Sequence, residues 1–384
     1  MSNQDSMNNE EFEMFKDMVK KFLAKEIEPK HPQWEKDGYL PRDMWNTLGD
    51  AGMLCVDLPV EYGGSGVDFR FSQLIISEIA RLGFVAMAGC VAIQSDIVAQ
   101  YILHIANEEQ KQYWLPKMAS AEVVAGIAMT EPGAGSDLQG MRSTAIKEGD
   151  HYILNGSKTF ITNGVNSDLV VVCAKTDPKA GGKGISLFLV DTTLEGFTKG
   201  KHLEKIGQHA GDTAELFFEN VRIPASALLG EEGAGFKYLM QELPRERLSI
   251  ATTSVAAAEG ALGWTVDYVQ ERKAFGKSIG EFQNTRFKLA EVKADIEIHK
   301  AYVEKCVAKY QTGDMSVTDA AIVKLTATEM QCRVVDTCLQ LFGGYGYMSE
   351  YPIARAYADA RVQKIYAGTS EIMKEVISRD LLGR

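Results

Sequence analysis

The hydrophobic pattern of this chain changes twice, and the changes limit the folds open to it. Up to about residue 122, apolar residues return every three or four positions, as on one face of a helix. Short runs of β-branched and aromatic residues follow, and near residue 231 the helical spacing returns. At 384 residues the chain exceeds one ordinary core. We therefore predict an α+β protein with an N-terminal all-α domain (1–122), a central antiparallel β domain (123–230) and a C-terminal four-helix bundle (231–384).

The N-terminal segment predicts several buried helices. The first contains Phe12 and is expected to be closed by Pro29 and Pro32. Apolar runs at 74–80 and 93–105 predict two more.

The central segment predicts antiparallel hairpins. Turn residues, including those at 148–150 and the pair Asn155–Gly156, separate the apolar runs. Strands are expected at 123–129, 151–154, 158–162, 169–174, 185–191 and 214–223.

The C-terminal segment predicts long helices. An apolar stripe runs from Leu289 to Tyr310 and ends at Gly313. Ser316, with Asp319 three residues later, resembles a capping box and predicts the start of the next helix. Long helices with broad apolar faces are typical of a bundle, and a surplus apolar face would suit oligomerisation.

Composition excludes several classes of function. Lysine and arginine total 41 against 52 acidic residues, with no basic run, so no nucleic-acid partner is expected. The six cysteines form no CxxC pair and the histidines no HExxH, so we expect neither disulfides nor a metal site. The chain has no uninterrupted apolar run of membrane-spanning length, and residues 1–13 lack a leader pattern. A cytoplasmic location without membrane insertion is expected.

The stretch 128–137, Ala-Met-Thr-Glu-Pro-Gly-Ala-Gly-Ser-Asp, carries the strongest functional signal. Its glycines, Gly133 and Gly135, allow close approach to a ligand and backbone angles closed to other residues. Its hydroxyls, on Thr130 and Ser136, are small adaptable donors. From composition alone, the stretch is either a cofactor loop or a simple turn.

This stretch is similar to the signature of the acyl-CoA dehydrogenase family, flavoproteins that desaturate acyl thioesters. The segments 271–277, 340–344 and 365–371 resemble the same family in the same order. The resemblance thus covers essentially the whole chain. It implies bound FAD, an order of helical, β and helical domains, and a homotetramer in which the C-terminal bundles pack together.

The resemblance also implies roles for single residues. Arg272 and Phe275 would reach FAD across a subunit boundary, and Phe160 would cover the flavin ring. Phe160 has an alternative as a core aromatic of the sheet, and Glu371 as an ordinary residue at a helix start. The residues implied to bind FAD are Met129, Thr130, Ser136, Phe160, Thr162, Arg272, Phe275, Gln283, Gln340, Gly343, Gly344, Thr369 and Glu371. Those implied to bind acyl-CoA are Ser136, Arg247 and Tyr366.

The position at which many members of the family carry their catalytic base is changed in this chain. Many members of the family carry a glutamate where this chain has Ala367, and alanine cannot accept a proton. The segment 241–248 resembles the long-chain and isovaleryl-type branch, whose base lies on another helix just before a substrate-binding arginine. Glu246 and Arg247 match that pair. The alternative is that these residues belong to a solvated charge run.

The resulting hypothesis is an FAD-dependent acyl-CoA dehydrogenase of the long-chain type, acting in fatty-acid β-oxidation. It would form a trans-2-enoyl-CoA and pass electrons to an electron-transfer flavoprotein. Two alternatives remain open. One is a dehydrogenase for a branched or terpenoid acyl-CoA such as citronellyl-CoA. The other is a catalytically silent protein that binds acyl-CoA and FAD.

Overall fold

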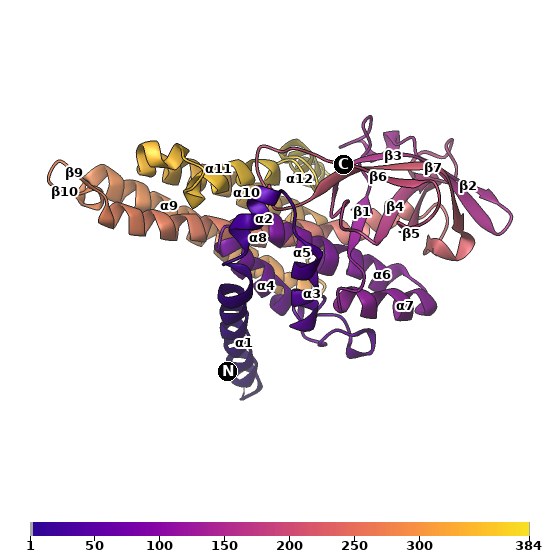
Figure 1. Ribbon diagram of the computed structural model, residues 1–384, viewed down its shortest axis with the longest axis horizontal. Helices are drawn as coiled ribbons and strands as arrows, with labels where there is room; N and C mark the ends of the chain where they lie inside the picture. The colour runs from indigo at the N-terminus through magenta and orange to yellow at the C-terminus, as the bar shows by residue number, and fades with distance from the viewer. Residues whose placement is uncertain (1–2, 384) are drawn as a thin grey trace.

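The computed structural model describes residues 3–383, with side chains from residue 10 onward. The sheet lies at one end of an elongated molecule, and the long C-terminal helices extend from it toward the other end (Figure 1). The N-terminal helices lie beside the junction of the two. The order of helices, sheet and helices confirms the predicted fold class.

The N-terminal region is helical, as predicted. Two π-helical segments, Leu23–Ile27 and Ile93–Val98, extend α1 and join α5 to α6. Pro32 does not close the first helix but lies in the first turn of α2, where its missing N–H group needs no partner. The helices are α1 (Asn3–Phe22), α2 (His31–Asp37), α3 (Arg42–Asp50), α4 (Phe69–Arg81), α5 (Val85–Ala92), α6 (Ala99–Ile105) and α7 (Glu108–Ala119).

The continuous helix Val85–Ile105 is, by length and composition, long and apolar enough to cross a membrane. Polar residues such as Gln94 and Asp96 interrupt its apolar surface, so the sequence shows no unbroken run there. However, 89% of its most apolar window is buried inside the protein. The helix packs against α4, β1 and the long helix α8 (Gly235–Glu271), as a core helix does.

The sheet is mixed, so the prediction of a purely antiparallel domain is wrong in part. β4 pairs in parallel with β1 and with one residue of β2, Thr144. Because β1 and β2 both run parallel to β4, the chain must return between them to the edge of the sheet where β1 began. The long loop 129–143 makes this return, whereas a hairpin turn would produce an antiparallel strand. The strand order is β6-β7-β3-β2-β4-β5-β8, with β1 beside β4. The strands are β1 (Ala125–Ala128), β2 (Thr144–Glu148), β3 (His151–Thr162), β4 (Leu169–Lys175), β5 (Ile185–Asp191), β6 (Phe197–His202), β7 (Thr213–Pro224) and β8 (Leu228–Leu229).

The predicted turn at Asn155–Gly156 is wrong. β3 is one strand, and Gly156 lies at a register shift in its pairing with β7. Gly156 has φ of +144°, and a Cβ there would lie 2.6 Å from the Cβ of Ser143. Glycine is therefore needed for a bulge rather than for a turn. The predicted turn at 148–150 is confirmed as the β2–β3 hairpin.

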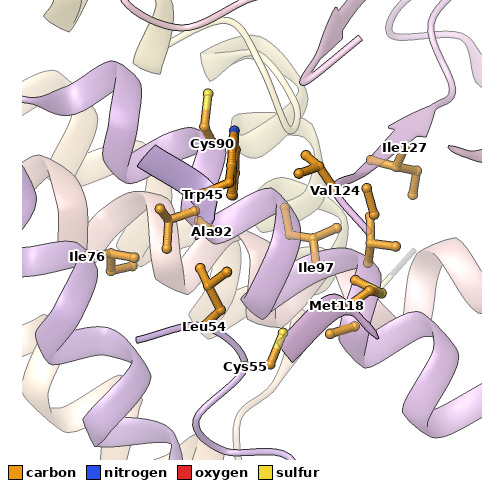
Figure 2. Close-up of a cluster of buried hydrophobic side chains, with 14 of the residues drawn as sticks. Trp45, Leu54, Cys55, Ile76, Cys90, Ala92, Ile97, Met118, Val124 and Ile127 are labelled. Carbon is orange, nitrogen blue, oxygen red and sulfur yellow. The ribbon is translucent and has the colours of Figure 1, made fainter. Parts of the chain in front are cut away.

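The sheet is buried on both faces at β4 and β5. Val170 and Val172 of β4 face a core within the β region. Val171 and Cys173 face a core shared with the N-terminal helices (Figure 2), in which Ile127 of β1 takes part. This two-sided burial explains why β4 is apolar at successive positions instead of alternating.

The C-terminal helices form the expected bundle, with one addition. Ser316 and Asp319 make the predicted capping box at the start of α10. The helix α10 contacts each of the other C-terminal helices, and the short α12 packs on it beside the four-helix core. The helices are α8, α9 (Gln283–Gln311), α10 (Val317–Phe342), α11 (Pro352–Gln363) and α12 (Ser370–Leu381).

Candidate active site

The charged segment of α8 is buried, so its interpretation as a solvated charge run is wrong. The exposed fractions of Glu242, Arg245, Glu246 and Arg247 are 8%, 4%, 3% and 5%. The helix packs against α4, α6, α10 and β5, so these charged side chains have no solvent-exposed face. Buried charges require partners or shifted pKa values, so each of these residues has a specific environment.

Arg245 has a structural environment. Its Nη2 lies 2.5 Å from Oδ2 of Asp57 and 3.0 Å from Oδ1 of Asp96. Its guanidinium also lies 4.4 Å from the ring centroid of Phe69. Paired in this way, Arg245 ties α8 to the N-terminal helices. This role could not be predicted from the sequence, since Asp57 and Asp96 belong to no motif.

Among the residues that the structure describes, the Glu246 carboxylate has one hydrogen-bond donor, and that donor is neutral. The hydroxyl of Tyr101 on α6 donates to its Oε1 over 2.9 Å. Burial raises the pKa of Glu246 from 4.5 to about 7, against the lowering effects of this hydrogen bond and of Arg247. A carboxylate with a pKa near neutrality can take a proton and release it again, as a general base must.

Glu246 lines a cavity of about 180 Å³ between α5, α8 and the sheet, which we call the Glu246 cavity. Ala367 lines the same cavity, so the two alternative positions for a base face one space. Apolar residues of the helix Val85–Ile105 form much of the remaining wall. The predicted site residues that also line the cavity are Met129, Thr130, Phe160, Thr162 and Tyr366.

Phe160 is not an aromatic of the sheet core, because its side chain is 68% exposed. Its backbone lies in the left-handed region, with φ of +59° at a register shift of β3. Gln208 and Ala367, which line the same cavity, also have positive φ, at +53° and +49°. Strained conformations of non-glycine residues concentrate at functional sites. Propensity patterns in the sequence gave no sign of these conformations.

The loop that follows β1 is fixed by a buried ion pair. Nζ of Lys158 on β3 lies 2.9 Å from Oε1 of Glu131 and donates to the carbonyl of Met129 over 3.0 Å. Glu131 also accepts from the backbone N–H groups of Arg142 and Ser143. Met129 and Thr130 are thereby held at the cavity wall. Lysine is rarely buried without a partner, so Lys158 within a predicted strand could have indicated this buried pair from the sequence.

One of the two roles predicted for the glycines of this loop, unusual backbone angles, is wrong. Neither Gly133 nor Gly135 has positive φ, and a Cβ at either would meet no atom within 4 Å. These glycines are therefore not required by backbone conformation. Open space beside them is compatible with a ligand that approaches the backbone closely.

The three residues implied to bind acyl-CoA have separate places. Tyr366 lines the Glu246 cavity, and its hydroxyl donates to Gln363. Arg247 lies behind the cavity wall, where its Nε donates to the carbonyl of Ala367 over 3.4 Å. Ser136 is exposed and does not line the cavity.

A second group of predicted residues lines another cavity, of about 560 Å³, which we call the Arg272 cavity. It contains Arg272, at the end of α8, with Gln340, Gly343 and Gly344 from the end of α10. The guanidinium of Arg272 lies 5.4 Å from the ring centroid of Tyr345. The site thus combines a cation, an aromatic ring and open glycine backbone.

Four other predicted residues line neither cavity. Phe275 is 95% exposed at the tip of the β9–β10 hairpin (Lys273–Ala274 and Lys277–Ser278), and Gln283 is exposed at the start of α9. Thr369 is the N-cap of α12 and accepts from the N–H of Ile372. Glu371 occupies the exposed first turn of α12, as its structural alternative anticipated.

The two cavities are far apart on one chain. Arg272 follows Glu246 by 26 residues (272 − 246), and α8 runs as far as Glu271. At 1.5 Å per residue, the separation along the helix axis is roughly 39 Å. Figure 1 shows the β9–β10 end of the molecule opposite the sheet.

Family models match along almost the whole chain. They are the N-terminal, middle and C-terminal domains of acyl-CoA dehydrogenase, at residues 9–122, 126–221 and 233–382. The chain belongs to the acyl-CoA dehydrogenase family. It is thus an FAD-dependent oxidoreductase, and the predicted family, enzyme class and cofactor are confirmed.

Individual relatives are similar over nearly the whole chain. The long-chain specific acyl-CoA dehydrogenase of Sus scrofa is 48% identical over 97% of this chain and 86% of its own length. A crystal structure of acyl-CoA dehydrogenase from Geobacillus kaustophilus has 48% identity and a TM-score of 0.94, covering 97% of this chain and 98% of that one. A structure described as the electron transferring flavoprotein of Acidaminococcus fermentans has 37% identity and a TM-score of 0.94, with the same coverage.

The residues present fit FAD. At the Glu246 cavity, the exposed ring of Phe160 offers a flat apolar face, and Thr130 and Thr162 offer hydroxyl groups for a polar ring edge. At the Arg272 cavity, the guanidinium suits phosphate oxygens, and a Cβ at Gly343 or Gly344 would meet no atom within 4 Å.

Proposed function

We propose that this protein oxidises long-chain acyl-CoA thioesters to trans-2-enoyl-CoA, with Glu246 as the base. The observation that carries the proposal is the position of Glu246. It is buried in the wall of the same cavity as Ala367, and burial raises its pKa to about 7. A silent binding protein would have no need of a carboxylate in so unfavourable a position.

The residues of the chain would act as follows. Glu246 removes the α-proton of the thioester, and the apolar wall contributed by Ile93, Ile97 and Ile127 keeps water from that carboxylate. Phe160 and Thr162 orient the flavin ring on the other side of the cavity. FAD, when bound, supplies the acceptor for the β-hydrogen as hydride.

The substrate class rests on the relatives. The long-chain specific enzyme of Sus scrofa covers 97% of this chain at 48% identity. The small lining residues Ala86, Gly89 and Ala92 on α5 leave room for an acyl chain. A role in fatty-acid β-oxidation follows from that substrate, and a branched or terpenoid thioester is the alternative that a substrate series would test.

Two features support the proposed partners. Transfer to an electron-transfer flavoprotein is supported by the structural similarity to a chain in the Acidaminococcus fermentans structure. A homotetramer is supported by the separation of the two cavities. One flavin contacted by both Phe160 and Arg272 requires a second copy of the chain, because the cavities lie roughly 39 Å apart along α8. A cytoplasmic location is also proposed, and the six free cysteines of the described chain suit a reducing compartment.

The test is reduction of the flavin by acyl-CoA without oxygen, over a series of straight and branched chains. Wild-type protein should bleach, fastest with long straight chains. Glu246→Gln should keep FAD and bind acyl-CoA, yet lose at least about 10²-fold in bleaching rate. Glu232→Gln is the matched control, because Glu232 also accepts from a buried tyrosine but lies outside the cavity. Near-normal bleaching by Glu246→Gln would show that Glu246 is not the base. Absence of bleaching in the wild-type protein would favour the catalytically silent binding protein.

A further inference from the structure

The two oxygens of the Glu246 carboxylate have different surroundings. Oε1 accepts the hydrogen bond from Tyr101 at 2.9 Å, and both side chains are buried. Oε2 has no hydrogen-bond partner among the described residues. Since Glu246 lines the cavity, one oxygen is held and the other is free to face a ligand.

We propose that Tyr101 is a positioning residue for Glu246, whose hydroxyl holds Oε1 and leaves Oε2 to take the substrate proton. This inference rests on the proposed function of Glu246. In the proton transfer, the C–H bond at the α-carbon breaks and an O–H bond forms at Oε2. The electron pair stays on the substrate. Tyr101 itself exchanges no proton.

Two side-chain contacts join α6 to α8 at Tyr101. Tyr101 contacts Glu246, and one turn later His104 contacts Glu242, with Nδ1 3.0 Å from Oε1. The spacing is three residues on α6 and four on α8, so both pairs lie on facing sides of the helices. The second contact is thus a further link between the faces of α6 and α8 that carry Tyr101 and Glu246.

The tyrosine hydroxyl also affects when Glu246 is ionised. A donor stabilises the carboxylate form, so the hydrogen bond from Tyr101 lowers the pKa of Glu246. Burial acts in the opposite direction and is the larger effect. The ionisable groups around Glu246 are Tyr101 on α6, Glu242 and Arg247 on α8, and Cys173 on β4. Arg247 favours the ionised form, whereas Glu242 disfavours it as a like charge.

Tyr101→Phe removes the hydroxyl and keeps the ring. The pKa of Glu246 should rise by about one unit, because one hydrogen bond to a charged group is lost. Turnover at pH 7 should fall roughly fivefold as the ionised fraction falls, and should recover at higher pH. The KM for acyl-CoA should stay unchanged, since the hydroxyl does not contact the substrate.

Tyr152→Phe is the matched control. The Tyr152 side chain is 1% exposed, and its hydroxyl donates to Oε2 of Glu232 over 2.7 Å, away from the cavity. It loses the same hydroxyl from a buried tyrosine that donates to a glutamate, although Glu232 itself is exposed. Its pH profile should equal that of wild type, whatever its effect on stability.

A second measurement does not depend on turnover. Infrared difference spectra between each protein and its Glu246→Gln form isolate the protonated carboxyl band of Glu246, whose pH titration gives the pKa directly. A higher pKa in Tyr101→Phe supports the inference, and an unchanged pKa overturns it even if Glu246 is the base. If Glu246→Gln keeps normal turnover, the proposed function fails instead, whatever Tyr101 does to the titration.

Discussion

At the scale of single residues, the buried position of Glu246 makes the folded protein less stable once the pH is high enough to ionise its carboxyl group. Its carboxyl has a native pKa of about 7, above the ordinary 4.5, because burial disfavours the charged form. The folded protein therefore holds that proton more tightly than the unfolded chain does. The resulting stabilisation is complete below pH 4.5 and is lost as the pH rises through 7. Asp359 has the same sign, with its pKa also raised to about 7 by burial.

Glu246→Gln should consequently be more stable than wild type at high pH. A shift from 4.5 to about 7 corresponds to about 3 kcal/mol at pH 8. Thermal denaturation should give a higher Tm for the variant at pH 8, and the Tm difference should shrink as the pH falls and be smallest below pH 4.5, where Glu246 is protonated in both the folded and the unfolded wild-type chain. Asp359 contributes equally to both proteins and cancels in the comparison. A variant less stable than wild type at pH 8 would contradict the burial argument.

At the scale of elements, β3 holds the loop after β1 against the wall of the Glu246 cavity. Lys158 on this strand is fully buried and holds Glu131, while Phe160, two residues later, is 68% exposed. The register shift between Lys158 and Ile161 allows one strand to present both. A regular strand would place 158 and 160 on the same face.

Lys158→Met should therefore damage both the loop and the flavin site. It leaves Glu131 buried without its cation, which costs about 3 kcal/mol or more. We expect a lower Tm and weaker FAD retention, measured by thermal denaturation and by flavin absorbance after gel filtration. The double variant Lys158→Met with Glu131→Gln removes both charges and should regain part of the lost Tm. If the double variant is no more stable than the single one, the buried charge is not the cause.

At the scale of the whole molecule, the residues predicted to bind one flavin lie in two cavities that are far apart within a single chain. Residues of the sheet line the Glu246 cavity, whereas the Arg272 cavity lies at the end of α8 that leads into β9. The β9–β10 hairpin and the sheet are at opposite ends of the molecule (Figure 1). The helix α8 links the two as a single rigid element of 37 residues. In the proposed homotetramer, the Arg272 end of another copy would complete the site, and closed symmetry would provide it reciprocally.

Mixed oligomers test this arrangement. Glu246→Gln and Arg272→Ala, co-expressed with different tags and purified for both, should be active although each is inactive alone. In a mixed pair, about half the sites combine an intact Glu246 with an intact Arg272 from different chains. Activity is read from acyl-CoA turnover and flavin content. Mixed oligomers as inactive as the single variants would place both residues in one chain's site or exclude the oligomer.

The sequence by itself determined the order of helices, sheet and helices, because the spacing of apolar residues is a local property of the chain. It also identified the family, and it predicted Glu246 as the base because Ala367 and Glu246 can be compared with the family position by position. The parallel pairing of β1 with β4, the bulge at Gly156 and the positive φ of Phe160 came only from the tertiary structure. Each depends on strands or loops distant in the chain. The same holds for the environment of Glu246. Its burial and its hydrogen bond from Tyr101 arise where α6 meets α8, 145 residues apart in sequence, and local patterns carry no information about such contacts.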